Sequence, residues 1–191
     1  MKTILFIRHG MTEGNRQKHY IGRTDQPLCP EGEKQAKGLA PRLPHCDMVF
    51  SSPLLRCRQT AAILFPKQDI NIITDLRECD FGIFEGKSPA QLAQDPAYNE
   101  WIGTYCTSPI PGGEDVMAFK TRSCEAFLQT VSGLPENSTA AFVVHGGSIM
   151  AILEGLAQPR RKFHEFHLAN CQYVICTYTH DTLTITGGSL C

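Results

Sequence analysis

The chain has 191 residues, and its 18 Lys plus Arg against 19 Asp plus Glu leave a formal net charge of −1. This length suits one domain with a sizeable core, and the near-neutral charge lacks the basic footprint of a nucleic-acid-binding protein. No apolar run is long enough to cross a membrane. The nine cysteines are an odd number without any Cys-x-x-Cys pair or secretory signal, so we expect reduced thiols in a cytoplasmic protein.

The first predicted strand, 3–7, leads directly into a cation and an imidazole. Its apolar residues end at Arg8-His9-Gly10. In open α/β sheets the ligand crevice lies outside the carboxyl ends of the strands. We therefore expect Arg8 and His9 in such a crevice, although these three residues taken alone favour a plain strand end.

Helices and strands alternate after this strand and a loop, and they are expected at 30–43, 47–51, 53–64 and 70–74. Ser52 is predicted to be the N-cap of the second helix, with Pro53 in its first turn. Arg56 then follows about one turn later. This placement aims Arg56 back toward the strand ends.

The stretch from about 80 to 115 interrupts the alternation. It is rich in turn residues and contains the only tryptophan, Trp101. We interpret it as a small cap over the crevice, because loops on a rigid scaffold usually carry specificity. Tyr98 and Trp101 either stack on part of a ligand or simply pack the cap onto the sheet.

A second strand with a terminal histidine follows the cap. A helix at 115–132 precedes a strand that ends at His145, and the next helix begins after two glycines. The remaining elements are expected at 140–144, 147–156, 172–178 and 182–186. Strands that alternate with helices predict an α/β fold, a three-layer sandwich with a mostly parallel central sheet flanked by helices.

Two arginines and two histidines thereby converge on one crevice. Arg8 and Arg56 offer planar guanidinium groups that match phosphate oxygens. The helix that starts beside His145 adds backbone N–H donors. The residues therefore predict a pocket for a phosphoryl group.

Four blocks of this sequence resemble, in order, the signatures of the histidine phosphatase superfamily, which includes the cofactor-dependent phosphoglycerate mutases. They are Arg-His-Gly-x-Thr-x-x-Asn at 8–15, Ser-Ser-Pro-Leu-Leu-Arg at 51–56, Leu-x-Glu with Phe-Gly-x-Phe-Glu-Gly at 76–86, and Val-His-Gly-Gly at 144–147. The resemblance runs through nearly the whole chain. It implies a single domain, 1–191, of phosphoglycerate mutase-like fold with a cap insertion at about 80–115.

The resemblance also implies phosphoryl transfer through a phosphohistidine. His9 would be the nucleophile, and the arginines around it disfavour its protonated form because like charges repel. The three non-bridging oxygens would be bound by Arg8, Arg56 and His145. Further substrate-binding donors would come from Asn15, Gly22 and Gly146.

The family's proton donor corresponds to Glu78, which ends the Leu-x-Glu motif. One carboxyl group can protonate the leaving alkoxide and then act as base for the attacking water. Glu85 and Glu114 are the other candidates. Glu85 is expected to be structural, and a role at a helix N-terminus is the alternative for Glu114.

The similarity extends to one branch of the superfamily. Phosphoglycerate mutases carry a longer insertion with paired arginines, whereas no Arg-Arg pair lies between Glu78 and His145. The short chain, the Tyr98-x-x-Trp101 spacing and the segment 110–114 resemble the phosphatase branch, particularly the α-ribazole phosphatases of cobalamin assembly.

Three functions stay open at this point. The first is a phosphomonoesterase for a small phosphorylated metabolite, such as α-ribazole 5'-phosphate, that needs no cofactor or metal because arginines and histidines neutralise the phosphate. The others are a mutase-type phosphotransferase and a non-catalytic phospholigand-binding domain. The last would lack His9, Arg8 or Glu78, and none is missing. The physiological substrate and the oligomeric state, monomer or homodimer, are left open.

Overall fold

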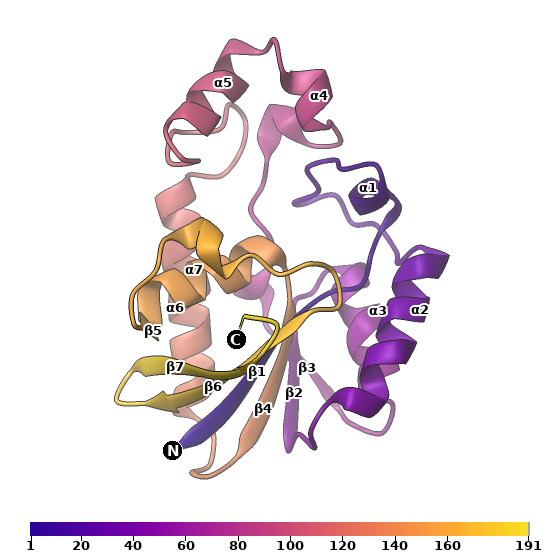
Figure 1. Cartoon of the computed structure of the whole chain (residues 1–191), viewed down its shortest axis with the longest axis vertical. Coiled ribbons are helices and arrows are strands. Elements are labelled where there is room, and N and C mark those ends of the chain that lie inside the picture. The colour runs from indigo at the N-terminus through magenta and orange to yellow at the C-terminus, as the bar shows by residue number, and fades with distance from the viewer. Residues whose placement is uncertain (191) are drawn as a thin grey trace.

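A seven-stranded sheet organises residues 1–190, the part of the chain that the computed structural model describes (Figure 1). Its order is β3-β2-β4-β1-β6-β7-β5. The strands β3, β2, β4 and β1 run parallel, and β6 is antiparallel to both β1 and β7. The strand bounds are Lys2–Arg8 (β1), Met48–Ser51 (β2), Ile70–Ile72 (β3), Thr139–Val144 (β4), Ala157–Gln158 (β5), Tyr173–Thr179 (β6) and Thr182–Gly188 (β7). The predicted α/β fold with a mostly parallel sheet is confirmed.

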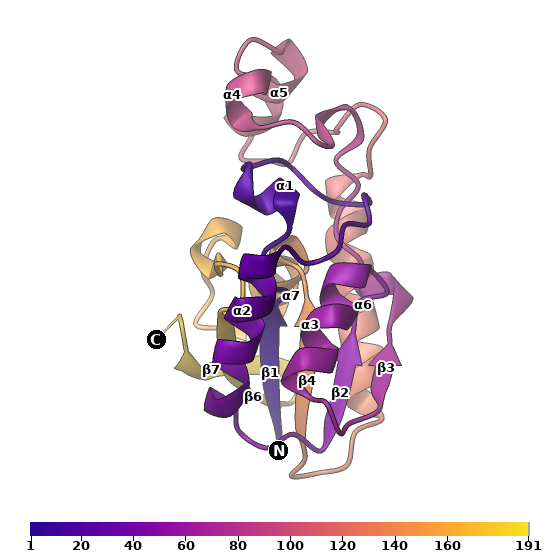
Figure 2. The same ribbon diagram turned by 90° about the vertical axis from the view of Figure 1, so that its right-hand side faces the viewer.

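Helices cover both faces of this sheet. Figure 2 shows α2 (Pro30–Leu39) and α3 (Leu55–Leu64) in front of it, with α6 (Val116–Ser132) and α7 (Gly146–Leu156) behind. The residues of β1 alternate between the two layers, since Leu5 packs under α2 and α3 while Phe6 packs under α6 and α7. A strand covered on both faces is buried along its length, which explains its continuous apolar run. None of the helices in the described residues is long and apolar enough to span a membrane.

Two helix ends differ from the sequence prediction. The helix expected from 53 begins at Leu55, and Ser52 is not its side-chain cap. The reason is that the N–H of Ser52 bonds to Val143 O at 3.2 Å and so continues the ladder of β2. The helix expected to reach residue 43 ends as α2 at Leu39, and a 3₁₀ turn follows, because Pro41 has no N–H for the α-helical ladder.

The cap stands above the carboxyl ends of the strands (Figure 1) and contains α4 (Pro89–Leu92) and α5 (Pro96–Gly103). Its own small core is aromatic: Phe84 is fully buried against the rings of Tyr98 and Trp101. Two hydrogen bonds join the stems of the cap, from Ile83 N to Pro111 O at 3.1 Å and from Glu114 N to Asp80 O at 3.0 Å. The cap therefore leaves and rejoins the sandwich at one place.

Candidate active site

Three neighbouring strands end side by side beneath the cap. In the parallel register Arg8 of β1 pairs with Val144 of β4, and Ser51 of β2 pairs with Val143. The residues that follow are His9, His145 and Ser52. Their side chains meet at one edge of the sheet, and the rings of His9 and His145 lie with centroids 5.2 Å apart.

A cleft of about 1100 Å³ opens between this edge and the cap. Near the strand ends it is lined by Arg8, His9, Asn15, Glu78 and Gly146. Farther out its lining is largely apolar and aromatic, and includes Tyr20, Phe81, Trp101, Ile110, Phe119 and Phe163. The cleft thus combines a polar inner end with an apolar outer part.

His9 is held as a neutral imidazole with one free nitrogen. It is only 3% exposed, and its Nδ1 lies 2.7 Å from Gly10 O. A carbonyl oxygen can only accept, so Nδ1 carries the proton and Nε2 keeps its lone pair. Burial, with the charges of Arg56 and Arg8, lowers the pKa of His9 well below its ordinary value. His9 Nε2 therefore has a lone pair that could act as a nucleophile without prior deprotonation.

His145 is the second buried, neutral histidine. Arg56 Nε donates to its Nδ1 at 3.3 Å, so the proton of His145 lies on Nε2 and points to Ser52 Oγ at 2.7 Å. Burial and the nearby Arg56 lower the pKa of His145 well below its ordinary value. Arg56 thus fixes the tautomer of this histidine, and Ser52, predicted as a helix cap, instead accepts the Nε2 proton.

Arg8 lines the cleft and keeps one donor without a partner. Its Nη1 donates to Leu168 O at 2.6 Å and lies 3.3 Å from His167 Nε2. Its Nε, by contrast, is one of two buried side-chain nitrogens without a hydrogen-bond partner in residues 1–190. The guanidinium also lies close to Gly146 at the start of α7, where an added Cβ atom would come within 3.3 Å of it. A partnerless guanidinium N–H beside a helix N-terminus is suited to an anion.

Arg56, His145 and Gly22 do not line the cleft, whereas the other predicted site residues do. Both ring nitrogens of His145 are used within the protein, so its expected contact with a phosphate oxygen does not match this arrangement. Arg56 is fully buried behind His145 and donates to Gly22 O at 2.8 Å and Thr24 O at 2.9 Å. The N–H of Gly22 is donated to Glu85 Oε1 at 2.9 Å. Both polar backbone groups of Gly22 are thus used within the protein, and its expected role as a substrate donor does not match this arrangement.

Of the three candidate glutamates, only Glu78 reaches the cleft. The carboxylate of Glu85 accepts from the backbone of Gly22 and Arg23 and from Thr24 Oγ1, between 2.7 and 2.9 Å, and so anchors the loop 22–24 to the start of the cap. The carboxylate of Glu114 forms a two-pronged ion pair with Arg122. Glu85 therefore has the structural role expected of it, and Glu114 is turned away from the nucleophile.

Glu78 has the environment of a proton donor. It is 9% exposed, and its oxygens accept from Cys79 N and Gly147 N, each at 3.0 Å. Burial raises the pKa of the Glu78 carboxyl, and the backbone donors and the two arginines oppose that rise only in part. A raised pKa lets a carboxyl donate a proton near neutral pH.

Asn170 is a site residue that the sequence did not indicate. Its Nδ2 donates to His9 O at 3.0 Å and to Asn15 Oδ1 at 3.2 Å. Asn15 Oδ1 also accepts from Thr12 N, so the amide nitrogen of Asn15 is the end left for a ligand. Asn170 lies in the loop before β6, where no periodic pattern could have pointed to it.

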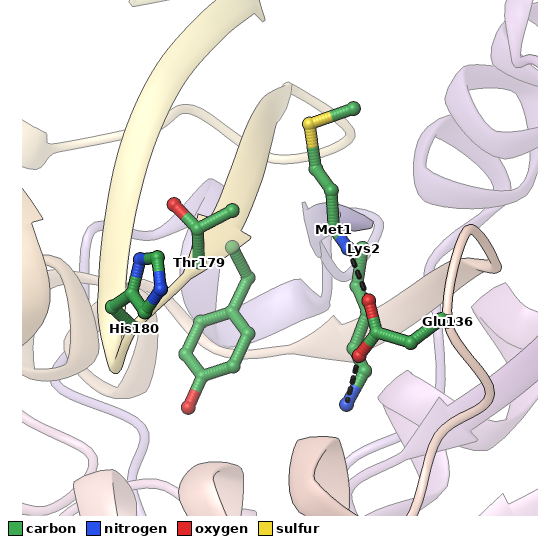
Figure 3. Close-up of a pocket in the computed structure, with 6 residues that line it drawn as sticks. Met1, Lys2, Glu136, Thr179 and His180 are labelled. Atoms are coloured by element: carbon green, nitrogen blue, oxygen red, sulfur yellow. Dashed lines mark hydrogen bonds and ion pairs between the residues drawn. The ribbon is translucent and has the colours of Figure 1, made fainter.

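A smaller hollow of about 220 Å³ lies at the other end of β1 (Figure 3). There the carboxylate of Glu136 pairs with the N-terminal amine of Met1 and, at 3.7 Å, with Lys2 Nζ. This hollow contains no paired nucleophile and acid, so the cleft is the candidate active site. Nowhere in residues 1–190 are three His, Cys, Asp or Glu side chains arranged to hold a metal ion, and no disulfide joins the cysteines of this range.

The geometry agrees with three kinds of similarity to known proteins. The model of the histidine phosphatase superfamily (branch 1) matches residues 4–188. The Proteus mirabilis (strain HI4320) protein named "Probable phosphoglycerate mutase GpmB" is 33% identical over 98% of this chain and 90% of its own.

Two crystal structures share the fold over nearly their full length. One is phosphoserine phosphatase from Entamoeba histolytica in complex with 3-phosphoglyceric acid, with a TM-score of 0.86, 27% identity, and coverage of 98% of this chain and 96% of that one. The other is the alpha-ribazole phosphatase from Shigella flexneri, with a TM-score of 0.84, 24% identity, and coverage of 96% and 94%. With the family's match spanning almost all of its residues, this chain belongs to the histidine phosphatase superfamily, branch 1.

Proposed function

We propose that this protein is a phosphomonoesterase that hydrolyses a small phosphorylated metabolite through a phosphohistidine on His9, without a metal ion. The observation that carries this proposal is the pairing of a neutral His9, free at Nε2, with the buried carboxyl of Glu78 in the same cleft. One group is ready to attack phosphorus, and the other is suited to give up a proton.

In the first step His9 Nε2 forms a bond to phosphorus while the ester P–O bond breaks. The proton of Glu78 passes to the departing oxygen, so the alcohol leaves neutral. Donors at the inner end of the cleft, namely Arg8 Nε, the amide of Asn15 and the N–H of Gly146, are placed to bind the non-bridging oxygens.

In the second step the ionised Glu78 takes a proton from water. The resulting hydroxide attacks phosphorus, the N–P bond breaks, and inorganic phosphate leaves with His9 neutral again. Arg56 contributes from behind: its hydrogen bond orients His145, and its positive charge disfavours protonation of His9.

The outer cleft supports a substrate with a bulky, partly apolar leaving group. A volume of about 1100 Å³ is large for a three-carbon acid and is comparable to pockets that take drug-sized ligands. Aromatic walls such as Trp101 and Phe119 suit a ring system. We therefore take α-ribazole 5'-phosphate as the first candidate, in line with the fold shared with the Shigella flexneri phosphatase.

A mutase-type phosphotransferase is the second candidate, favoured by the name of the Proteus mirabilis relative. Against it, the sole arginine between Glu78 and His145 is Arg122, and its guanidinium is fully engaged within the protein. It is not free to bind a substrate carboxylate.

The test is release of inorganic phosphate, with a chelator present, from α-ribazole 5'-phosphate, phosphoserine, sugar phosphates, nucleotides and 3-phosphoglycerate. We expect release that His9→Ala abolishes and that the exposed-site control His45→Ala retains. Transfer of labelled phosphate between hydroxyl groups with little release would establish the mutase. No turnover of any kind would leave a phospholigand-binding domain.

A further inference from the structure

We infer that Arg122, held by Glu114, is a positioning residue that fixes the main chain carrying Glu78. This inference rests on the proposed function, in which Glu78 is the general acid. Arg122 projects from α6 and does not line the cleft, so it does not itself touch the substrate.

All five N–H donors of the Arg122 guanidinium are used. Nη1 donates to Asp75 O at 2.7 Å and to Arg77 O at 2.9 Å, and Nη2 donates to Glu78 O at 3.1 Å. The other two donors, on Nε and Nη2, reach the two carboxylate oxygens of Glu114 at 2.6 and 2.7 Å. One side chain therefore binds three carbonyls in the four residues that end at Glu78.

This segment needs such an anchor because it has little regular structure of its own. A single 3₁₀ turn, Thr74–Leu76, is followed by an extended Arg77. Carbonyl groups outside a ladder that are partly removed from water, here those of Arg77 and Glu78, need donors from elsewhere. Arg122 supplies them from α6, and Ser148 Oγ adds weaker contacts to Leu76 O and Arg77 O at 3.3 and 3.4 Å.

Glu78 is consequently fixed at two levels. Its main chain is bound by α6 through Arg122, and its carboxylate is bound by α7 through the Gly147 N–H. The charges that act on the Glu78 carboxyl are those of Arg56 and Arg8. Arg122 is not among them, although its charge contributes slightly to the lowered pKa of His145, so its link to Glu78 is the hydrogen bond to the main chain.

A lysine cannot reproduce this fork, because its ammonium is a single point with three donors. Arg122→Lys keeps the charge but should let the Glu78 segment shift. Displacement of a catalytic group by about 1 Å costs roughly 100-fold in rate. We therefore expect kcat/KM for an alkyl phosphate, whose leaving oxygen needs a proton, to fall by about 10- to 100-fold.

The diagnostic comparison uses p-nitrophenyl phosphate, whose phenolate leaves without a proton. Because kcat/KM reports the steps up to formation of the phosphohistidine, Arg122→Lys should lower it much less for this substrate. Glu114→Gln, which removes the charge that pairs with Arg122, should also lower kcat/KM more for the alkyl phosphate than for p-nitrophenyl phosphate, to a smaller degree. The matched control is Arg42→Lys, at an exposed arginine on the 3₁₀ turn after α2, which should leave kcat/KM unchanged for both substrates.

The outcomes separate the inference from the function beneath it. Glu78→Gln is the reference, since removing the acid must affect the alkyl substrate more than the aryl one. If Glu78→Gln lowers kcat/KM mainly for the alkyl substrate, but Arg122→Lys lowers kcat/KM equally for both substrates or for neither, the positioning role is refuted. If Glu78→Gln itself is not selective, the acid assignment fails and the inference falls with it. Should Arg122→Lys not fold, as judged by circular dichroism, Glu114→Gln decides by the same criterion.

Discussion

Replacing Gly147 by alanine tests the position of the proposed acid most directly. A Cβ atom built at Gly147 would lie 2.3 Å from Glu78 Oε1, and 3.1 and 3.2 Å from the carboxyl carbon and the other oxygen. Ordinary contact requires the carboxylate to retreat by about 1 Å, which is expected to cost roughly 100-fold in kcat/KM, or about 2.7 kcal/mol of transition-state stabilisation. The moving group is the far end of a side chain, so we expect the variant to fold.

The assay is kcat/KM for alkyl phosphate hydrolysis, with circular dichroism and thermal unfolding to establish the folded state. Gly38→Ala in α2 is the matched control, since its added methyl group would meet no atom within 4 Å. This control should keep full activity and gain about 0.5–1 kcal/mol of stability. A folded Gly147→Ala protein with the activity of the wild type would refute the placement of Glu78 beside the reacting phosphate.

Three further predictions concern titration and burial. Because the pKa values of His9 and His145 are lowered in the folded protein, the free energy of unfolding should fall as pH drops below about 6.5. In a denaturation series, His9→Gln should lessen the slope of this fall by about 1.4 kcal/mol per pH unit. An unchanged slope would contradict the lowered pKa of His9. The pH dependence that Glu78 contributes has the opposite sign, because burial raises the pKa of its carboxyl. The wild type should therefore lose stability relative to Glu78→Gln as pH rises through the folded pKa of Glu78. A stability difference between the two proteins that does not change with pH would contradict the raised pKa. Ser52→Ala removes the acceptor of the His145 Nε2 proton and should cost about 1–3 kcal/mol, whereas Ser132→Ala, at an exposed serine, should stay within about 0.5 kcal/mol.

The parts of the site that could be predicted are those attached to regular elements. His9 and His145 each follow an apolar strand, and parallel pairing of two such strands brings their ends together. Arg8 follows from the same pattern. Glu78 has no such signal of its own, and only the resemblance to a family distinguished it from the other glutamates of its neighbourhood.

The residues that could not be predicted act through contacts between distant segments. Ser52 carries a typical helix-cap signal, yet strand pairing and His145 compete for its polar groups and prevail. Asn170 and Arg122 bind backbone carbonyls far away in the chain, and such partners leave no periodic trace in sequence. The sequence predicts Arg56 as a ligand of the phosphoryl group, but not its burial behind His145, where its donors are used within the protein.

The cap shows why the two interpretations of its aromatic residues could not be separated from sequence. Tyr98 packs in the cap core and shares a 3.0 Å hydrogen bond between its hydroxyl and that of Tyr20, so it does not line the cleft. Trp101 packs in the same core and also lines the cleft. Both residues have the same chemical character and lie on one short helix, and only the packing of the cap distinguishes them.

The paired stems of the cap decide which part of the chain could be exchanged to alter the outer cleft. Glu85 and the main-chain bonds between Tyr20 and the pair Gly86 and Lys87 join the cap's first residues to the loop that surrounds Arg56. Beyond these contacts, the segment 88–110 supplies residues such as Trp101 and Ile110 to the outer part of the cleft. Because Tyr98 and Trp101 of this segment pack against Phe84, a chimaera has to exchange the whole cap between its paired stems. If the proposed function is right, such an exchange changes the lining that faces the leaving group and keeps the residues at the inner end of the cleft.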